Sequence, residues 1–520
     1  MIRTVNTRFI LRPCWLIAIF LEAVLCSGQQ ASEAQKPAES ATPTEDTSSS
    51  ISATFRSRTD LVLVPVAVRD KKGEHVSGLS KEAFQLEENG KGQTISLFEE
   101  IHAPVANLLQ AVTPDRGYSN LPFDNAGELR LTIMVLDLLN TGPFQRTDGR
   151  DQFIKFLSKG LAANQPVSLL CITSKGLRLV HPFSTDTNSL IESLKKTPLG
   201  AFTIANRTNV VYGTIAQLRE IAQGYAGIPG RKTMILAAGY IPELATERQM
   251  IETTEYASDL QRMWKSLMDA NIAVYPIQLM EWAADPARGG LHSRPNYIFL
   301  RDFADNTGGN RCLEANALME CLTEAVDDSR SYYMLGFSVQ PEDRKPGWRD
   351  LKVKVSGEHL DVRARNGFYY GVLPAGDSKS VRDDEINALA SPLAASGVPM
   401  FVKVLPSQAS STPPAAGGKN TVEFLMTIPL SSIKIDGTRS TPLDLEVGAI
   451  ALTDQGKEAG EFLHPVQGNP KPENVQQWAR DGIKLKEKLD LPPGSYDVRF
   501  LVRDNNASQI GTVVFPLDVH

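Results

Sequence analysis

Asp137 is the residue of this 520-residue chain best placed to do chemistry, because it ends a continuous apolar run. The run is LTIMVL, residues 131–136, and Asn140 and Thr141 follow the carboxylate closely. An apolar run of this length is typical of a strand covered on both faces, as in a parallel sheet. Ligands of open α/β sheets bind beyond the carboxyl ends of such strands. We therefore expect Asp137 to lie where a cation or a partner would be met.

Two interpretations of Asp137 are compatible with this position. Its carboxylate can ligate a divalent cation, which prefers oxygen ligands. Alternatively, the carboxylate caps the loop after the strand by accepting hydrogen bonds from backbone N–H groups, and we favour this role. Thr208, near the start of a later helical segment, has a similar pair of interpretations, a metal ligand or the N-cap of the helix.

No pattern of catalytic residues accompanies Asp137. The chain contains no Gly-x-Ser-x-Gly, His-Glu-x-x-His, Cys-x-x-Cys or phosphate-binding Gly-Lys-Ser/Thr sequence. The seven histidines include no pair at metal-ligand spacing. We therefore expect a protein that is not an enzyme and that has no small-molecule cofactor.

Strands and helices that would position Asp137 alternate over residues 129–371. This rhythm predicts a central α/β domain with a doubly wound, mostly parallel sheet. Residues 167–173 and 177–183 are both strand-like, and only three residues separate them. That connection is too short for a crossover, so the pair predicts a hairpin with one antiparallel strand at the sheet edge.

The remaining segments predict a modular, exported chain. Residues 1–28 have the basic, apolar and small-residue regions of a signal peptide, and residues 29–55 have the composition of a disordered linker. Alternatively, the signal segment is not cleaved and anchors the chain in a membrane. We expect no other contact with a membrane. Residues 56–102 predict a small β module, and residues 399–520 predict an immunoglobulin-like β-sandwich. Residues 103–128, which carry Pro, Gly and Asn, and residues 372–398 predict linkers.

Two of the cysteines that remain after cleavage lie nine positions apart, at Cys312 and Cys321. An exported protein can oxidise such a pair to a disulfide. Nine residues along one straight helix are too far apart for the bond, so Cys312 would have to lie in the loop before the helix. The formal charge of −6, without a Lys/Arg stripe, argues against a nucleic-acid partner.

Several phrases of the chain resemble one group of proteins. They are LVLVPVAVRDKKGEHVSGLSKEAFQLEENG, LTIMVLDLLNT, PGRKTMILAAGY, ANIAVYPI, FADNTGGN, SYYMLGF and VRARNGFYYG. Together they make residues 55–371 resemble the von Willebrand factor A-type domains, and among them the exported "VWFA-related Acidobacterial domain" proteins. This resemblance implies a metal-ion-dependent adhesion site with an Asp-x-Ser-x-Ser loop, a threonine from a second loop and an aspartate from a third.

The chain departs from that adhesion site at two positions. Asp137, Thr141 and Thr208 match, but Leu139 replaces a hydroxyl ligand and Ala238 stands near the expected aspartate. The resemblance therefore implies a degenerate site with at most three metal ligands, namely Asp137, Thr141 and Thr208, and weak Mg²⁺ or Ca²⁺ binding at most.

Our leading hypothesis is an exported protein of the periplasm, cell envelope or extracellular space. It would bind a protein partner or an envelope component at the carboxyl ends of the central strands, through Asp137, Asn140, Thr141 and Thr208. One alternative is an adhesion protein that depends on a divalent metal. Another is a structural envelope component that docks through its C-terminal β-sandwich.

Overall fold

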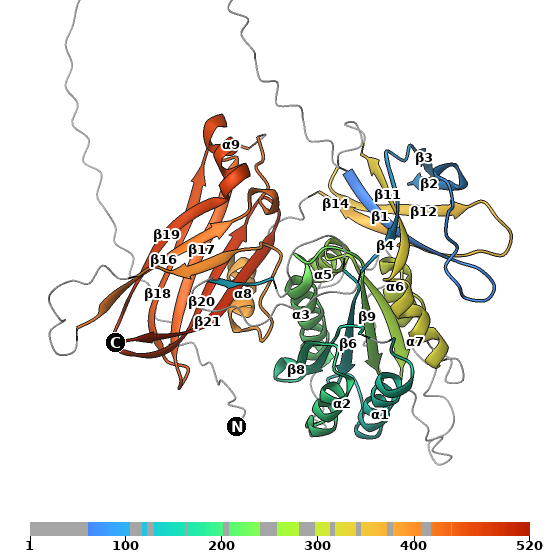
Figure 1. The fold of residues 1–520 in the computed structure, drawn as a ribbon, viewed down its shortest axis with the longest axis horizontal. Helices are drawn as coiled ribbons and strands as arrows, with labels where there is room; N and C mark the ends of the chain where they lie inside the picture. Colours follow the sequence, from blue (N-terminus) through green and yellow to red (C-terminus); the bar gives the residue numbers. More distant parts are fainter. Residues whose placement is uncertain are drawn as a thin grey trace, which may run out of the picture. The chain divides into compact units, whose positions relative to one another are not determined.

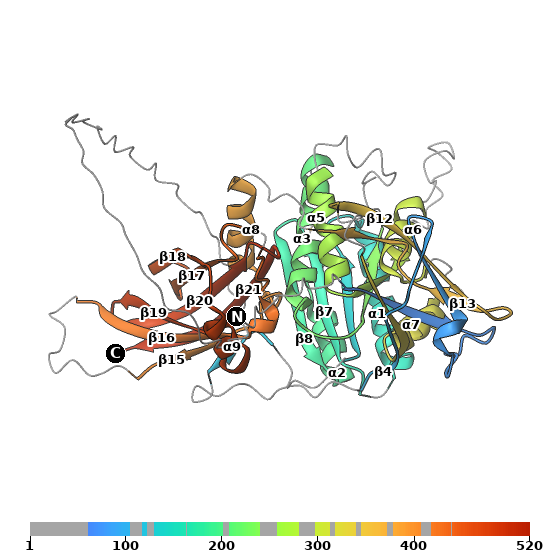
Figure 2. The ribbon, with the colours of Figure 1, turned by 90° about the horizontal axis from the view of Figure 1, so that it is seen from above.

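The structure is a computed structural model that describes most of the chain from Leu61 onward (Figures 1 and 2). The described residues are 61–104, 117–121, 129–162, 164–200, 207–239, 257–279, 297–312, 318–339, 345–371, 378–406, 418–437 and 439–520. Residues 60–520 form one compact unit. The predicted signal peptide (1–28) and linker (29–55) lie outside the described residues, as do residues 105–116, 122–128 and 372–377 of the other predicted linkers.

Asp137 ends the middle strand of a five-stranded sheet whose order is β10-β9-β6-β7-β8. The first four strands are parallel, and β8 runs antiparallel to β7 because a tight hairpin joins the two. Residues of β6 are buried along its whole length, as its apolar sequence requires. The strands are β6 (Leu131–Asp137), β7 (Val167–Thr173), β8 (Gly176–Ser184), β9 (Lys232–Ala238) and β10 (Ile272–Gln278).

Helices pack on this sheet through two apolar clusters. Ile133 and Val135 of β6 belong to one cluster, which includes residues of α3, α5 and α6. Met134 and Leu136 belong to the other, which includes residues of α1, α2 and α7. Because successive side chains of a strand point to opposite sides, the two clusters lie on opposite faces of β6. The helices are α1 (Pro143–Lys159), α2 (Thr187–Lys196), α3 (Arg207–Tyr225), α5 (Ala257–Asp269), α6 (Tyr297–Thr307) and α7 (Leu318–Asp327).

Two antiparallel sheets combine the segment before β6 with the segment after α7. Their orders are β13-β1-β11-β4 and β14-β12-β2-β3. A one-turn 3-10 helix, Lys81–Ala83, precedes β2. The strands are β1 (Leu61–Arg69), β2 (Phe84–Glu88), β3 (Lys91–Gln93), β4 (Leu97–His102), β11 (Ser331–Ser338), β12 (Gly347–Val355), β13 (Asp361–Arg363) and β14 (Gly367–Tyr370).

The C-terminal residues form two further antiparallel sheets, β19-β16-β15-β5 and β18-β17-β20-β21, which share one apolar core. Strand β5 (Tyr118–Ser119) comes from the segment predicted to be a linker, and Tyr118 stacks on Phe515. The other elements are α8 (Ser378–Ala390), β15 (Phe401–Val404), β16 (Asn420–Ile428), the 3-10 turn Leu430–Ser432, β17 (Leu443–Thr453), β18 (Glu458–Gly468), α9 (Pro472–Asp481), β19 (Ile483–Leu491), β20 (Gly494–Asp504) and β21 (Gln509–Val519).

The predicted fold class is wrong for the chain. The described strands form five separate sheets and most of their pairs are antiparallel, so the protein is mostly β and is not built on a single doubly wound parallel core. The small N-terminal β module does not stand apart either, because β1 and β4 pair with β11, and β2 pairs with β12. The physical reason is that apolar periodicity marks a strand but does not choose its partner.

No helix within the described part of the chain is long and apolar enough to cross a membrane.

Candidate functional site

The loop after β6 is organised around the Asp137 carboxylate. The side chain of Asp137 is fully buried. Its Oδ1 accepts the backbone N–H groups of Leu139 and Asn140, both at 2.9 Å. Its Oδ2 accepts a hydrogen bond from Nδ2 of Asn140 at 2.6 Å. Both carboxylate oxygens are therefore occupied by the loop that the aspartate caps.

Two further bonds tie this loop to neighbouring elements. Asn140 Nδ2 also donates to Thr214 Oγ1 of α3 at 2.9 Å. Thr141 Oγ1 accepts the N–H of Gly239, directly after β9, at 2.9 Å. Thr141 is completely buried, so its hydroxyl is a structural acceptor. Asn140 Oδ1 is buried and has no hydrogen-bond partner among the described residues.

Arg146 of α1 holds the other side of the loop. Its Nε donates to the Thr141 carbonyl at 2.8 Å, and a guanidinium nitrogen donates to the Leu138 carbonyl. The same group reaches the carbonyl of Leu199, beyond α2, at 2.9 Å. A guanidinium has donors only, so Arg146 satisfies carbonyls that the sharp turn leaves without backbone partners.

The electrostatic state of Asp137 follows from its burial. Loss of solvent raises the pKa of Asp137 to about 6, while the hydrogen bonds from Asn140 and Leu139 and the charge of Arg146 act in the opposite direction. The carboxylate is thus costly to ionise and is held by its own loop. It is not a strong, free anion at the surface.

The predicted metal ligands do not fit a hard cation in this geometry. Asp137 and Thr141 already use their oxygens within the loop, Leu139 offers only hydrocarbon, and the Arg146 guanidinium opposes a second positive charge. Thr208 lies in the first turn of α3, but its side chain is outside the described residues. Magnesium and calcium need about six or more oxygen ligands. No group of three or more His, Cys, Asp and Glu side chains is arranged around a metal position in the described residues.

Two exposed aromatic side chains lie on the helices that contact this loop. Phe144, in the first turn of α1, is 89% exposed, which is about twice the exposure of the next most exposed large apolar side chains among the described residues. Tyr212 of α3 is 37% exposed, and Leu139 is half-buried against the same helix near Gly213. We call the loop 138–142 together with Phe144 and Tyr212 the rim.

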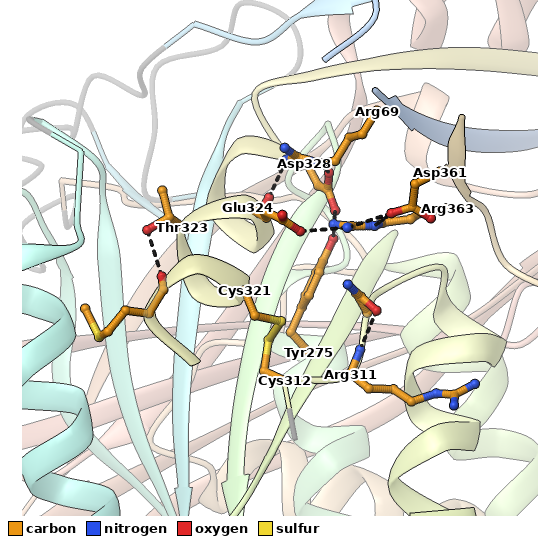
Figure 3. The surroundings of a disulfide bond; sticks show 12 residues. Arg69, Tyr275, Arg311, Cys312, Cys321, Thr323, Glu324, Asp328, Asp361 and Arg363 are labelled. Atoms are coloured by element: carbon orange, nitrogen blue, oxygen red, sulfur yellow. Dashed lines mark hydrogen bonds and ion pairs between the residues drawn. A yellow bond between two sulfur atoms is a disulfide. The ribbon is translucent and has the colours of Figure 1, made fainter. Parts of the chain in front are cut away.

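A buried charge cluster that the sequence analysis did not single out lies elsewhere (Figure 3). Asp328, which is 1% exposed, accepts from Arg69 Nε at 2.6 Å, Arg363 at 3.0 Å and the Tyr275 hydroxyl at 2.5 Å. Burial opposes ionisation of Asp328, but the charges of Arg363, Arg69 and Arg231 lower its pKa below the ordinary value. The cluster links β1, β10 and β13 to the end of α7 and has a structural role.

Cys312 and Cys321 are joined by a disulfide, with Cα atoms 5.5 Å apart (Figure 3). Cys312 lies before α7 and forms a parallel bridge with Ile277 of β10. The bond therefore fastens α7 beside the edge strand of the central sheet. Cys171 is a buried free thiol on β7.

Comparison with known proteins adds no family to this description. No family model matches the chain, and no curated protein matches it. Among solved structures, proximal thread matrix protein 1 from the mussel byssus has a TM-score of 0.25 and 11% identity. That match covers 39% of this chain and 48% of the mussel chain, so this chain spans about half of that protein. The TFIIH p34 N-terminal domain has a TM-score of 0.23 and 11% identity over 38% of this chain and 95% of that domain. Similarity this weak carries no argument about fold or function.

Proposed function

We propose that this chain is an exported, non-enzymatic protein that binds a protein partner through the rim, without a bound metal. It remains our proposal that the chain is related to the von Willebrand factor A-type proteins it resembles. The single observation that carries the binding proposal is the 89% exposure of Phe144 close after a loop that is held by its own hydrogen bonds.

Exposed aromatic residues at fixed positions are suited to protein recognition. Aromatic side chains dominate binding energy at interfaces when they enter a pocket of the partner. The bonds from Asp137 to its loop and from Thr141 to Gly239 hold the backbone just before α1, so the position from which Phe144 projects is fixed before binding. The partner that fits this rim is a protein with an apolar pocket.

Two features support export. The first 28 residues have the pattern of a signal peptide. The disulfide between Cys312 and Cys321 is a bond that persists in oxidising compartments. The periplasm, the cell envelope and the extracellular space all meet this condition.

The test compares two apolar surface positions in the purified, immobilised chain. Phe144→Ser removes the rim anchor, and Leu463→Ser removes a 38% exposed side chain from β18 as a matched control. Envelope extracts are passed over both variants and the unchanged chain, with and without a chelator, and bound proteins are quantified by mass spectrometry.

We expect at least one protein whose capture falls roughly tenfold or more with Phe144→Ser, as for a binding hot spot. Its capture should not change with Leu463→Ser or with the chelator. Capture that is equal for Phe144→Ser and the unchanged chain would contradict the proposal. Loss of capture with the chelator would instead support the metal-dependent alternative, and loss with Leu463→Ser alone would support docking through the C-terminal sheets.

A further inference from the structure

The outer face of one C-terminal sheet carries lysines around an exposed aromatic side chain. In this sheet, β19-β16-β15-β5, alternate residues such as Val402, Met426 and Leu489 are buried in the shared apolar core. The residues between them point to the opposite, outer side of the sheet. We use the name lysine face for Phe401 and the four exposed lysines on that side, which are Lys403 of β15 and Lys484, Lys486 and Lys488 of β19.

The strand register brings these side chains close together. Leu425 of β16 is paired with Lys486 on one side and with Lys403 on the other. Neighbouring strands lie about 4.8 Å apart, so the two lysines flank the leucine directly. The adjacent row has Lys484 on β19 and Phe401 on β15, with one threonine of β16 between them. Phe401 is 45% exposed. Apolar and positively charged groups therefore share one surface.

The four lysines differ in whether a carboxylate neutralises them. Lys488 Nζ lies 2.6 Å from Glu423 Oε1, so this pair carries no net charge. Asp490, on the same side of β19 beyond Lys488, accepts a hydrogen bond from the Thr421 hydroxyl at 2.6 Å. The other three lysines make no hydrogen bond or ion pair with any residue that the structure describes. Unpaired positive charge is therefore concentrated at the end of the face that carries Phe401.

This concentration is not explained by composition or by protection of a sheet edge. The chain has a formal charge of −6, so a group of unpaired lysines is opposite in sign to the molecule as a whole. Lysines on an edge strand such as β19 also prevent edge-to-edge pairing of sheets. Lys403 and Phe401, however, lie on β15, an inner strand whose edges are already paired. A local positive surface of this kind attracts a polyanion.

We propose that the lysine face binds the surface of an anionic lipid bilayer. Lys403, Lys484 and Lys486 would contact acidic headgroups, and Phe401 would enter the boundary between headgroups and acyl chains. Lysines suit this place because their apolar stems lie along apolar surface while the charged ends stay in water. Attraction to anionic lipid together with buried apolar area is what holds proteins at a bilayer surface.

This contact is not expected from the sequence, because Lys403 and the lysines of β19 lie far apart along the chain and meet only in the folded sheet. It goes beyond the proposed function, since the lysine face belongs to the C-terminal sheets and does not include the rim. The bilayer would position the chain, and the rim would remain available to a protein partner.

The test is co-sedimentation of the purified full chain with vesicles. One preparation contains only neutral phosphatidylcholine, and in the other about a third of the lipid is anionic phosphatidylglycerol. We expect tighter binding to the anionic vesicles, and we expect this difference to disappear at high salt because salt screens the attraction. All variants keep the same N-terminus, so residues 1–28 contribute equally to every measurement.

Two variants of the lysine face make the assignment specific. The triple variant Lys403→Ala, Lys484→Ala, Lys486→Ala should weaken binding to anionic vesicles roughly a hundredfold, at about fivefold per lysine. Phe401→Ser should weaken it at least roughly threefold, because it removes the apolar group that enters the bilayer. All four positions are exposed, so the fold should be retained, and thermal unfolding checks this.

The matched control removes the same charge elsewhere, through Lys71→Ala, Lys72→Ala and Lys81→Ala at exposed positions between β1 and β2. It should bind anionic vesicles like the unchanged chain, and so should Phe144→Ser, which separates this test from that of the rim. No preference for anionic vesicles, or equal binding by the two triple variants, would overturn the proposal. Binding to soluble polyphosphate as tight as to vesicles, with no effect of Phe401→Ser, would also overturn it and assign the face to a soluble polyanion.

Discussion

The carboxylates of Asp137 and Glu100 are held in different ways. Asp137 is fully buried, and its own loop occupies both oxygens. Glu100 is partly exposed; one oxygen is held by the backbone N–H of Gly78, and the other faces the imidazoles of His75 and His102. The first carboxylate caps the loop that it begins, whereas the second connects the turn after β1 to β4. The role of a carboxylate is thus decided by the groups that it contacts, and its place at the end of a strand is not enough.

The largest expected difference between the two regions is in stability. Asp137→Ala leaves two backbone N–H groups and the Asn140 amide without the acceptor that Asp137 provides. Because several buried donors lose this acceptor, we expect a loss of about 3–5 kcal/mol in the free energy of unfolding. His102→Ala, at an exposed position, should change it by no more than about 0.5 kcal/mol. Urea unfolding of both variants at pH 7 measures the contrast.

Equal, small effects of these two substitutions would contradict the structural role of Asp137. A large effect of His102→Ala would show that His102 contributes to the packing of the fold despite its 62% exposure.

A second contrast lies in the pH dependence of stability. Burial raises the pKa of Asp137 from 3.8 to about 6, so the folded chain keeps this proton at a pH where the unfolded chain has lost it. Its contribution to stability is therefore greatest below about pH 4, falls as the pH rises to about 6, and is constant above that. The fall amounts to about 3 kcal/mol at about 1.4 kcal/mol per pKa unit.

This contribution is isolated by measuring unfolding of the unchanged chain and of Asp137→Asn between pH 4 and 7. The other titrating groups are the same in both proteins, so their effects on stability cancel in the difference. The unchanged chain should lose more stability than the variant as the pH rises. Parallel curves would show that Asp137 titrates normally and is not desolvated by its loop.

A smaller effect is expected from Thr141→Val, which keeps the shape of a fully buried side chain but removes its hydroxyl. The N–H of Gly239 then has no acceptor, at a cost of about 1–3 kcal/mol. Denaturant unfolding measures the loss. Addition of Mg²⁺ or Ca²⁺ should not restore stability to the variant or raise that of the unchanged chain, whereas a metal-dependent site would make the unchanged chain respond to the ion.

The smallest effect on stability is expected from Phe144→Ser. The ring makes little contact with its own chain at 89% exposure, so the free energy of unfolding should change by no more than about 0.5 kcal/mol. Thermal unfolding checks this. A large destabilisation would mean that Phe144 packs in the fold and does not serve as a binding anchor.

Particular residues show what could be foreseen from the sequence. The run 131–136 predicts a buried strand, and the structure places β6 there with Asp137 at its end. The pairing of β1 with β11 could not be foreseen, because it joins segments more than 260 positions apart that apolar patterning treats alike. The contact between His75 and Glu100 could not be foreseen for the same reason: 25 positions separate the two residues, and β4 joins the sheet of β1 only through its pairing with β11.

The measurement that tests the account of Asp137 most directly is a calorimetric titration of the unchanged chain and of Asp137→Asn with Mg²⁺ and with Ca²⁺. We predict no heat from either ion with either protein, because the loop already occupies both oxygens of Asp137. Binding of Mg²⁺ or Ca²⁺ by the unchanged chain that disappears in Asp137→Asn would contradict the account.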